Sequence, residues 1–259
     1  MYRNLLFEVN EHICTLTLNR PESYNAINDE ISYELQDAWK KIRKDDDIRV
    51  VILTGAGKAF CSGQDLKAIK DSKDRNLAES LHKRYNPIIR AMRSLPKPII
   101  ARLNGVAAGA GASFALACDL IVASEKSSLI EVFVKVGLVP DSGSSYFLMR
   151  NLGYLRAFEL AATGRKLSAA EALDLGLVNK VVAHEALDDA VTEYARYFAG
   201  APTKSIGLIK SMLDKAASHG LDAMLEYEAY CQEIAGNSED YKEGVQAFNE
   251  KRKPEFKGR

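Results

Sequence analysis

The fold is clearest in residues 99–123, IIARLNGVAAGAGASFALACDLIVA, which read as strand, glycine-rich turn, helix and strand. Residues 99–103 and 119–123 are mostly branched or small apolar residues, as in strands that are buried on both faces. Residues 110–117 are mainly small and apolar, which suits a short helix packed against those strands. This succession of strand, helix and strand predicts an α/β fold.

The same alternation extends upstream of this stretch. Residues 5–9 and 13–18 predict a hairpin, and residues 50–53 predict a buried strand. Between them, Asn28 is placed to cap a helix over residues 29–44, which carries a stripe of apolar residues on one face. The first half of the chain therefore also alternates between strands and helices.

The last quarter of the chain has a different pattern. After about His184 the strand patterns disappear, and a succession of helices is predicted with breaks near Pro202, Gly220 and Gly236. We expect an α/β core over residues 1–195 and a helical region over residues 196–259. A helical tail after such a core often packs between subunits, and the alternative is that it covers its own core.

Bulk composition limits the classes of function. Lys+Arg and Asp+Glu both number 35 in the 259 residues, so no net charge draws the chain to nucleic acid or to an anionic membrane. The longest apolar stretches, such as residues 106–117, are too short to span a bilayer. The four cysteines and four histidines form no metal-site spacing. We expect a cytoplasmic protein in a reducing compartment, without a metal, nucleic acid or membrane partner.

Two glycine-rich segments carry the candidate chemistry: residues 60–66, FCSGQDL, and residues 104–113, NGVAAGAGAS. Each follows a predicted strand, so each can bring backbone N–H groups close to a ligand. Two such donors that converge on one oxygen form an oxyanion hole. A dinucleotide fingerprint is disfavoured because Phe114 stands where its third glycine is needed, and a phosphate loop is disfavoured by Ile52 and Ala59. Either segment alone is more typical of tight turns and close packing.

Six ordered motifs, which include the two glycine-rich segments, resemble the crotonase (enoyl-CoA hydratase/isomerase) superfamily over nearly the whole chain. This resemblance favours a functional role for the two segments. The motifs are NRP at 19–21 with NAIN at 25–28, FCSGQDL at 60–66, NG at 104–105 with GAG at 109–111 and CD at 118–119, GLVP at 137–140, GRKLSAAEA at 164–172, and GLV at 176–178. The resemblance implies a spiral of ββα units with a C-terminal helical trimerisation region. It also implies a homotrimer or dimer of trimers that acts on an acyl-CoA thioester, with coenzyme A as part of the substrate and no separate cofactor.

The resemblance also assigns roles to residues by position. It places the oxyanion-hole donors at the backbone N–H groups of Ser62 and Ala110, where alanine replaces the more usual glycine. Arg20 and Lys67 become candidates for the coenzyme A phosphates. The basic tail around Phe256 is expected to serve a neighbouring subunit, although a solvated surface tail is the simpler interpretation. The further substrate-binding residues implied are Gln64, Asp65, Gly109 and Phe133.

The carboxylates near the oxyanion hole decide the reaction. Hydratases of this family hold a water between two glutamates, and the matching positions here are Ser113 and Phe133, which cannot polarise water as an acid/base pair. Hydration is therefore disfavoured. Glu131 is a weaker candidate, because a strand period of two could aim it at the same face only with a shift of register.

Asp141 is the more informative acid. From pattern alone it reads as the N-cap of a helix over residues 141–146. The resemblance instead places it against the acyl group, as in the ring-1,2-epoxyphenylacetyl-CoA isomerases and related enoyl-CoA isomerases. Packed among Phe133, Val136 and Leu138, its carboxyl group is expected to have a raised pKa and to act as the acid/base of an isomerase.

Two other functions are disfavoured. The 4-chlorobenzoyl-CoA dehalogenases also carry an Asp at this place, but their Trp and His partners correspond to Phe133 and Arg90, and the single tryptophan, Trp39, reads as core. A non-catalytic acyl-CoA- or RNA-binding scaffold on this frame is disfavoured by net neutrality and by the retained oxyanion segments. The natural acyl group and pathway stay open, because the pocket depends on a polar segment over residues 67–81, which precedes a predicted helix to Arg93.

Overall fold

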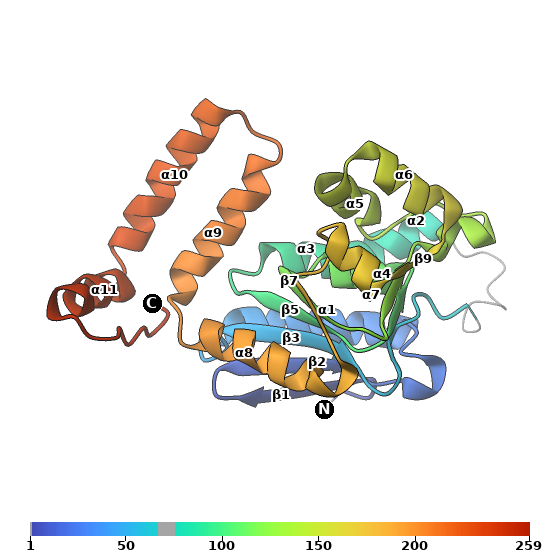
Figure 1. Ribbon diagram of the computed structural model, residues 1–259, viewed down its shortest axis with the longest axis horizontal. Coiled ribbons are helices and arrows are strands. Elements are labelled where there is room, and N and C mark those ends of the chain that lie inside the picture. The colour runs from blue at the N-terminus through green and yellow to red at the C-terminus, as the bar shows by residue number, and fades with distance from the viewer. Residues whose placement is uncertain (1, 67–75) are drawn as a thin grey trace.

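A computed structural model describes residues 2–66 and 76–259, and it contains two β-sheets (Figure 1). The larger sheet has the strand order β1 (Leu5–Asn10), β2 (Ile13–Leu18), β3 (Val50–Gly55), β5 (Ile99–Leu103), β7 (Leu120–Ser124) and β10 (Lys180–Val182). Its strands are parallel except for the antiparallel β1–β2 hairpin. The smaller sheet has the order β4 (Ala59–Cys61), β6 (Val106–Ala108), β8 (Ser128–Ile130) and β9 (Lys166–Ser168).

The helices connect and cover these sheets. They are α1 (Asp29–Lys44), α2 (Leu77–Ser80), α3 (Asn86–Ser94), α4 (Ala110–Leu116), α5 (Ser144–Leu152), α6 (Tyr154–Thr163), α7 (Ala169–Asp174), α8 (Leu187–Ala199), α9 (Thr203–Ala216), α10 (Leu221–Gly236) and α11 (Glu239–Glu250). Three short 3-10 turns, η1 (Pro21–Ser23), η3 (Val132–Val136) and η4 (His184–Ala186), and the π-helical turn η2 (Leu81–Tyr85) complete the described elements.

The architecture repeats a ββα unit. A strand of the large sheet leads directly into a strand of the small sheet, as β3 into β4, β5 into β6 and β7 into β8, and a helix then returns the chain. Because β3, β5 and β7 are parallel, the segments that follow them leave the large sheet at one edge. The predicted α/β spiral with C-terminal helices is confirmed.

Local sequence explains the elements that were predicted. The side chain of Asn28 accepts a hydrogen bond from the backbone N–H of Ile31 at 2.9 Å, which caps α1 as expected. The apolar stripe of α1 is buried, and it includes Trp39, which belongs to the core. The hairpin and the strands β3, β5 and β7 lie within two residues of their predicted bounds.

The helix predicted to end near Arg93 is interrupted by a wider turn. Pro87 has no N–H, so it cannot bond the carbonyl of Lys83 four residues before it. The side chain of Gln36 supplies the missing donor, with its Nε2 at 2.9 Å from the Lys83 oxygen and 3.3 Å from the Arg84 oxygen. The chain passes through the π-helical turn η2 at this point, which the periodicity did not reveal.

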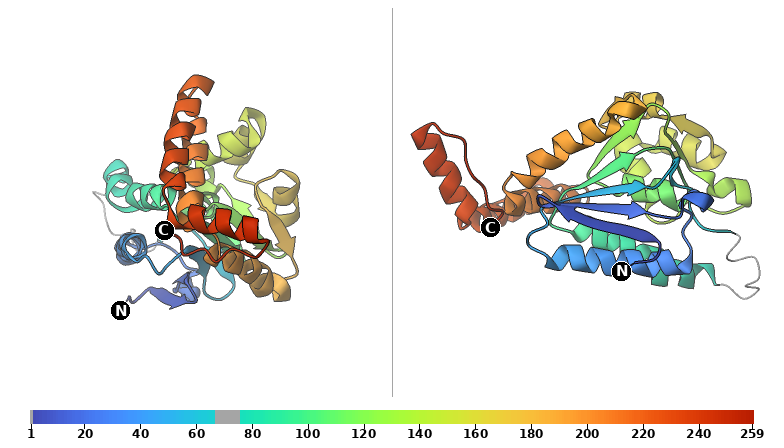
Figure 2. Two further views of the ribbon diagram at one scale, coloured as in Figure 1. Left: turned by 90° about the vertical axis from the view of Figure 1, so that its left-hand side faces the viewer. Right: turned by 90° about the horizontal axis from the view of Figure 1, so that it is seen from below.

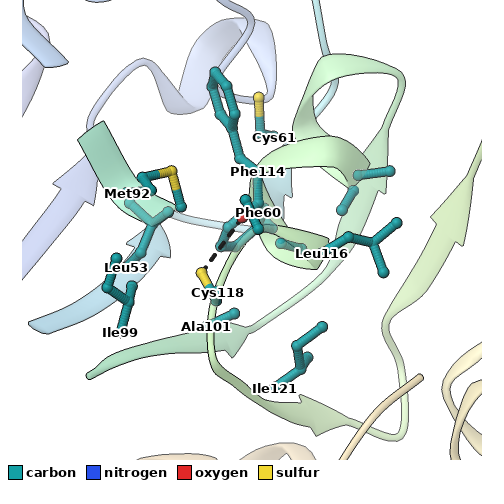
Figure 3. Packing of buried hydrophobic residues seen from close by; sticks show 14 of the residues in the cluster. Leu53, Phe60, Cys61, Met92, Ile99, Ala101, Phe114, Leu116, Cys118 and Ile121 are labelled. Carbon is teal, nitrogen blue, oxygen red and sulfur yellow. Dashed lines mark hydrogen bonds between the residues drawn. The ribbon is translucent and has the colours of Figure 1, made fainter. Parts of the chain in front are cut away.

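The core fills both faces of the large sheet. One cluster joins α1, α3 and α4 to the sheet, and Figure 3 shows part of it, including Leu53, Met92 and Phe114. A second cluster packs α8 against the opposite face, through Val50, Ile100 and Val122. Helix α8 thus belongs to the core, and the domain boundary expected between residues 195 and 196 falls inside it.

Helices α9, α10 and α11 project from the rest of the chain (Figures 1 and 2). The buried Lys210 of α9 anchors them, because its Nζ donates to Asp119 Oδ2 at 2.8 Å and to the Met92 carbonyl at 2.9 Å. Arg49 provides a second anchor through the carbonyls of Ala201 and Phe256. A groove of about 1170 Å³ lies between these helices and the core.

Candidate active site

The two glycine-rich segments meet at the small sheet. Strand β4 pairs in parallel with β6, so residues 62–66 and 109–113 leave that sheet side by side. A Cβ atom on Gly111 would lie 2.2 Å from the Cys61 carbonyl oxygen, which is closer than any side chain allows. Glycine at this position is therefore required for the close approach of the two segments.

Ala110 presents a free backbone donor at this junction. It is the first residue of α4, and no acceptor for its N–H lies among the residues that the structure describes. A Cβ atom on Gly63, where φ is +90°, would lie 3.5 Å from the Ala110 nitrogen, so the first segment runs directly past this N–H group. Ala110 is thus suited to the donor role expected of it.

The N–H of Ser62 is not free. It donates to the carbonyl of Tyr24 at 3.0 Å, and the Ser62 hydroxyl donates to the carbonyl of Ser23 at 3.2 Å. A substrate oxygen would have to break the first of these bonds to reach the Ser62 nitrogen. The geometry therefore does not support the donor role that the resemblance placed at Ser62.

Gln64 offers the second donor instead. It forms a parallel bridge with Ile27, in which the Ile27 N–H donates to the Gly63 oxygen at 2.7 Å and the Asp65 N–H donates to the Ile27 oxygen at 2.9 Å. This pattern turns the N–H of Gln64 away from Ile27. In residues 2–66 and 76–259 it has no backbone or side-chain acceptor. Gln64 and Ala110 thus each present an unpaired N–H group at this junction, within the described residues.

Arg20 and Asp65 support the first segment. The guanidinium of Arg20 contacts Asp65 Oδ2 at 3.0 Å and donates to the Ala26 carbonyl at 2.6 Å. Both side chains are mostly buried, so this ion pair fixes the loop that carries Gln64. Arg20 is thereby already paired, whereas Lys67, the other cation expected to meet phosphate, lies outside the described residues.

Asp141 lies in the loop between η3 and α5. Burial raises the pKa of its carboxyl group, and a hydrogen bond from the Ser142 hydroxyl at 2.8 Å opposes part of that rise. Helix α5 begins at Ser144 with Gly143 as its N-cap, and no side chain caps it. The N-cap interpretation of Asp141 is therefore wrong, and its carboxyl group is not engaged with the helix.

The surroundings of Asp141 match expectation only in part. Phe133 is buried, and its ring lies within 3.8 Å of the place where a Cβ atom on Gly109 would be. Val136 and Leu138 were expected to shield the acid, but they are 55% and 39% exposed in the single chain. In the single chain these two side chains therefore remain largely accessible to solvent.

Ser113 is fully buried at the position of the first hydratase glutamate. Its hydroxyl lies 2.7 Å from the Ser144 hydroxyl and 3.2 Å from the Asp141 carbonyl oxygen. Ser113 and Phe133, the residues at the two positions expected for the hydratase glutamates, thus carry no carboxylate.

Glu131, the weaker candidate from sequence, is a buried acid close to the Asp141 loop. Strand β8 ends at Ile130, so the strand period used to orient Glu131 does not reach it. Its Oε1 accepts a hydrogen bond from the Ser144 hydroxyl at 3.2 Å, and its Oε2 is buried with no partner among the residues that the structure describes. Burial, with a smaller contribution from the charge of Asp141, raises the pKa of Glu131 to about 7. A lone glutamate directly after a buried strand was the available signal.

Phe256 lies elsewhere in this chain. A Cβ atom on Gly244 of α11 would lie 3.4 Å from its ring, and its carbonyl oxygen accepts from Arg49 Nη1 at 3.0 Å. Figure 1 places this end of the chain away from α4. Phe256 and the junction of Gln64 and Ala110 are thus not brought together within one chain.

Two other classes of site were sought in the described residues. No three His, Cys, Asp or Glu side chains converge there as metal ligands would. Across residues 2–66 and 76–259, no helix combines the length and hydrophobicity that crossing a bilayer requires.

The model of one protein family, described as enoyl-CoA hydratase/isomerase, matches residues 8–259. The chain belongs to the enoyl-CoA hydratase/isomerase family. Among its relatives, the 1,2-epoxyphenylacetyl-CoA isomerase of Escherichia coli K12 is 42% identical over the full length of both chains. A probable enoyl-CoA hydratase of Rhodobacter capsulatus is 38% identical over 100% of this chain and 99% of the relative.

Solved structures of this family agree with the fold. The enoyl-CoA hydratase of Bacillus anthracis superposes with a TM-score of 0.95 at 34% identity, covering 99% of this chain and 100% of that chain. Relatives in this family are thus named both as isomerases and as hydratases. The two reactions need different side chains near Asp141.

Proposed function

We propose that this member of the enoyl-CoA hydratase/isomerase family is an acyl-CoA isomerase, with Asp141 as its acid/base. The observation that carries the proposal is a half-buried carboxyl group at Asp141 that forms no ion pair within the described residues, combined with serine and phenylalanine at positions 113 and 133. One acid can move a proton between two carbons, whereas activation of water in this family uses two.

The thioester oxygen is held by two backbone donors. In the proposed complex the N–H groups of Gln64 and Ala110 point at this oxygen, and the N-terminus of α4 adds its favourable dipole. Each such donor stabilises the negative charge of an enolate by about 2.7–4 kcal/mol. The proton on the carbon next to the thioester becomes removable for that reason.

Asp141 then transfers the proton. Its carboxylate removes a proton from the α-carbon of a 3-enoyl thioester, and the electron pair of that C–H bond spreads over a dienolate. The protonated Asp141 returns the proton to the γ-carbon, which leaves the double bond conjugated and the atoms balanced. Burial makes Asp141 a stronger base than an exposed aspartate. In an epoxide substrate, the same stabilisation of the thioester enolate by the two backbone donors would assist the ring rearrangement.

Hydration is the second candidate, because some relatives are named as hydratases and Glu131 is a buried acid with one oxygen that has no partner in residues 2–66 and 76–259. Against it, Glu131 is only 5% exposed and two serine hydroxyls link it to the Asp141 loop. It therefore has no direct access to a water on the substrate.

Absorbance of the conjugated thioester distinguishes the two reactions, because they change it in opposite directions. With a 3-enoyl-CoA the purified protein is expected to raise this absorbance, and with crotonyl-CoA it is expected to leave it nearly constant. A rapid fall with crotonyl-CoA and no rise with the 3-enoyl thioester would identify a hydratase and overturn the proposal.

We further propose that the chain works as a homotrimer or dimer of trimers. The projecting helices expose large apolar side chains, among them Leu213, Leu225 and Phe248. Such an exposed apolar surface is typical of an interface with another subunit. In such an assembly the Phe256 tail of one subunit would reach the substrate of another. Sedimentation equilibrium is expected to give three or six times the 28.6 kDa mass of the chain, and a monomer would contradict this.

A further inference from the structure

A line of side-chain hydrogen bonds connects the buried acid Glu131 to the loop of Asp141. The Ser144 hydroxyl lies 3.2 Å from Glu131 Oε1, the Ser113 hydroxyl lies 2.7 Å from the Ser144 hydroxyl, and the Asp141 carbonyl oxygen lies 3.2 Å from the Ser113 hydroxyl. Both serines are fully buried. Water therefore cannot easily substitute for any member of the line.

Each serine hydroxyl has only one proton to donate, and this restricts the line to two arrangements. Ser113 faces three acceptors: the oxygens of Gly109, at 3.3 Å, and Asp141, and the hydroxyl of Ser144. Ser144 faces two, the Ser113 hydroxyl and Glu131. The direction in which Ser144 donates therefore decides what Ser113 can do.

The charge of Glu131 selects the direction. An ionised Glu131 can only accept, so Ser144 donates to it and Ser113 donates to Ser144, and the Asp141 carbonyl loses its hydroxyl donor. A protonated Glu131 can donate to Ser144, which then donates to Ser113, and Ser113 donates to the Asp141 carbonyl. The only covalent change is the proton that Glu131 exchanges with solvent.

We propose that Glu131 is a positioning residue, which in its protonated form holds the catalytic loop by directing the Ser113 hydroxyl onto the Asp141 carbonyl. The inference rests on the proposed role of Asp141 as the acid/base of an isomerase. When Glu131 loses its proton, the hydrogen bonds of the line reverse direction and the Asp141 carbonyl loses its bond from Ser113. Turnover falls for that reason.

The backbone of the loop explains why it needs such a hold. Ser142 and Gly143, directly after Asp141, both have positive φ, at +51° and +86°. A left-handed conformation is strained for a non-glycine residue such as Ser142, because its Cβ comes close to the following carbonyl oxygen. The Asp141 carbonyl also accepts the N–H of Ser144 at 2.9 Å, so the Ser113 hydroxyl adds a second bond at the point where the strained turn begins.

The charges that face Glu131 favour retention of its proton. Asp141 faces it from the loop, and Arg165 lines the same small cavity, where the other lining residues are apolar. The guanidinium of Arg165 is occupied by Glu159, at 2.7 Å, and by Glu171, at 2.6 Å. The side chain of Lys135 lies near Gly164 and is exposed. No cation is thus available to compensate an ionised Glu131 within the described residues.

The direction of the pH dependence follows from these contacts. Because the pKa of Glu131 is raised to about 7, the protonated form is present below about pH 7 and is lost as the pH rises through that value. For a single ionisation of this kind, the turnover number for a 3-enoyl-CoA is expected to fall by up to about tenfold between about pH 6 and about pH 8.

The variant Glu131→Gln tests this, because glutamine has nearly the same shape and cannot ionise. In the full chain it is expected to keep turnover at about pH 6 and to lose the fall above pH 7. Ser113→Ala, which removes the hydroxyl that reaches the Asp141 carbonyl, is expected to lower turnover at about pH 6 and also to lack the fall. The matched control is Glu185→Gln, an exposed glutamate paired with Lys126, which should retain the wild-type profile.

A wild-type fall above pH 7 in Glu131→Gln would overturn the inference while leaving the isomerase intact. A chain that isomerises no 3-enoyl-CoA would instead contradict the proposed function. Infrared absorption of the protonated Glu131 carboxyl group in D2O tests the line of hydroxyl groups independently of enzyme activity. The band that Glu131→Gln removes should titrate near pH 7 and move to higher pH in Ser144→Ala, because Ser144 stabilises the ionised form. A band that does not move contradicts the line.

Discussion

Replacement of Asp141 by asparagine is expected to reduce the turnover number for a 3-enoyl-CoA by about 10²–10⁴-fold, the usual contribution of a general acid/base. Asparagine keeps the size of the side chain and an oxygen that can accept from Ser142, so the loop should keep its shape. It cannot carry the proton. KM should therefore change little, because the backbone donors that hold the thioester are untouched. Steady-state kinetics measures both quantities.

An exposed aspartate provides the control for this variant. Asp174 lies at the end of α7 on the surface, and Asp174→Asn is expected to leave both constants unchanged. Should Asp141→Asn keep full isomerase activity while it folds normally, Asp141 would not be the acid/base.

Replacement of Ala110 by proline is expected to lower turnover by about 10²–10³-fold, because proline removes one of the two proposed oxyanion donors. Ala110 is the first residue of α4, a position where proline is tolerated because its N–H has no partner within the helix. The free energy of unfolding should therefore fall much less than the activation free energy rises. Kinetics on the 3-enoyl thioester and chemical denaturation measure the two effects.

Ala110→Gly is the matched variant, since glycine retains the N–H and removes only a methyl group. It is expected to keep turnover within about threefold of wild type, in line with a donor that belongs to the backbone. Equal losses in the proline and glycine variants would indicate that shape at this position, rather than the N–H group, matters.

Much of the fold follows from local sequence. The cap at Asn28, the apolar stripe of α1 and the alternation of strand and helix around residues 99–123 are local signals, and the structure contains each of them. The turn η2 escaped prediction because it depends on Gln36, a distant side chain that bonds the carbonyl left open by Pro87. The sequence shows the proline but not the partner that compensates for it.

The site shows the same division between local and distant information. The motif at residues 60–66 predicted the segment that we propose as part of the oxyanion hole. Which N–H remains free there depends on Tyr24, whose left-handed φ of +53° aims its carbonyl at Ser62. The link from Glu131 to Asp141 through two serines likewise comes from three separate segments. Contacts of this kind arise from tertiary packing, and no spacing in the sequence encodes them.

The most direct test of the account is to incubate the protein with a 3-enoyl-CoA in D2O and to weigh the product by mass spectrometry. The expected product is the conjugated isomer without added oxygen. Part of it should still carry its original hydrogen, because the half-buried Asp141 returns the proton that it removed before solvent exchanges it. An unchanged 3-enoyl-CoA, together with crotonyl-CoA that gains the mass of one D2O molecule, would contradict this prediction and identify the protein as a hydratase.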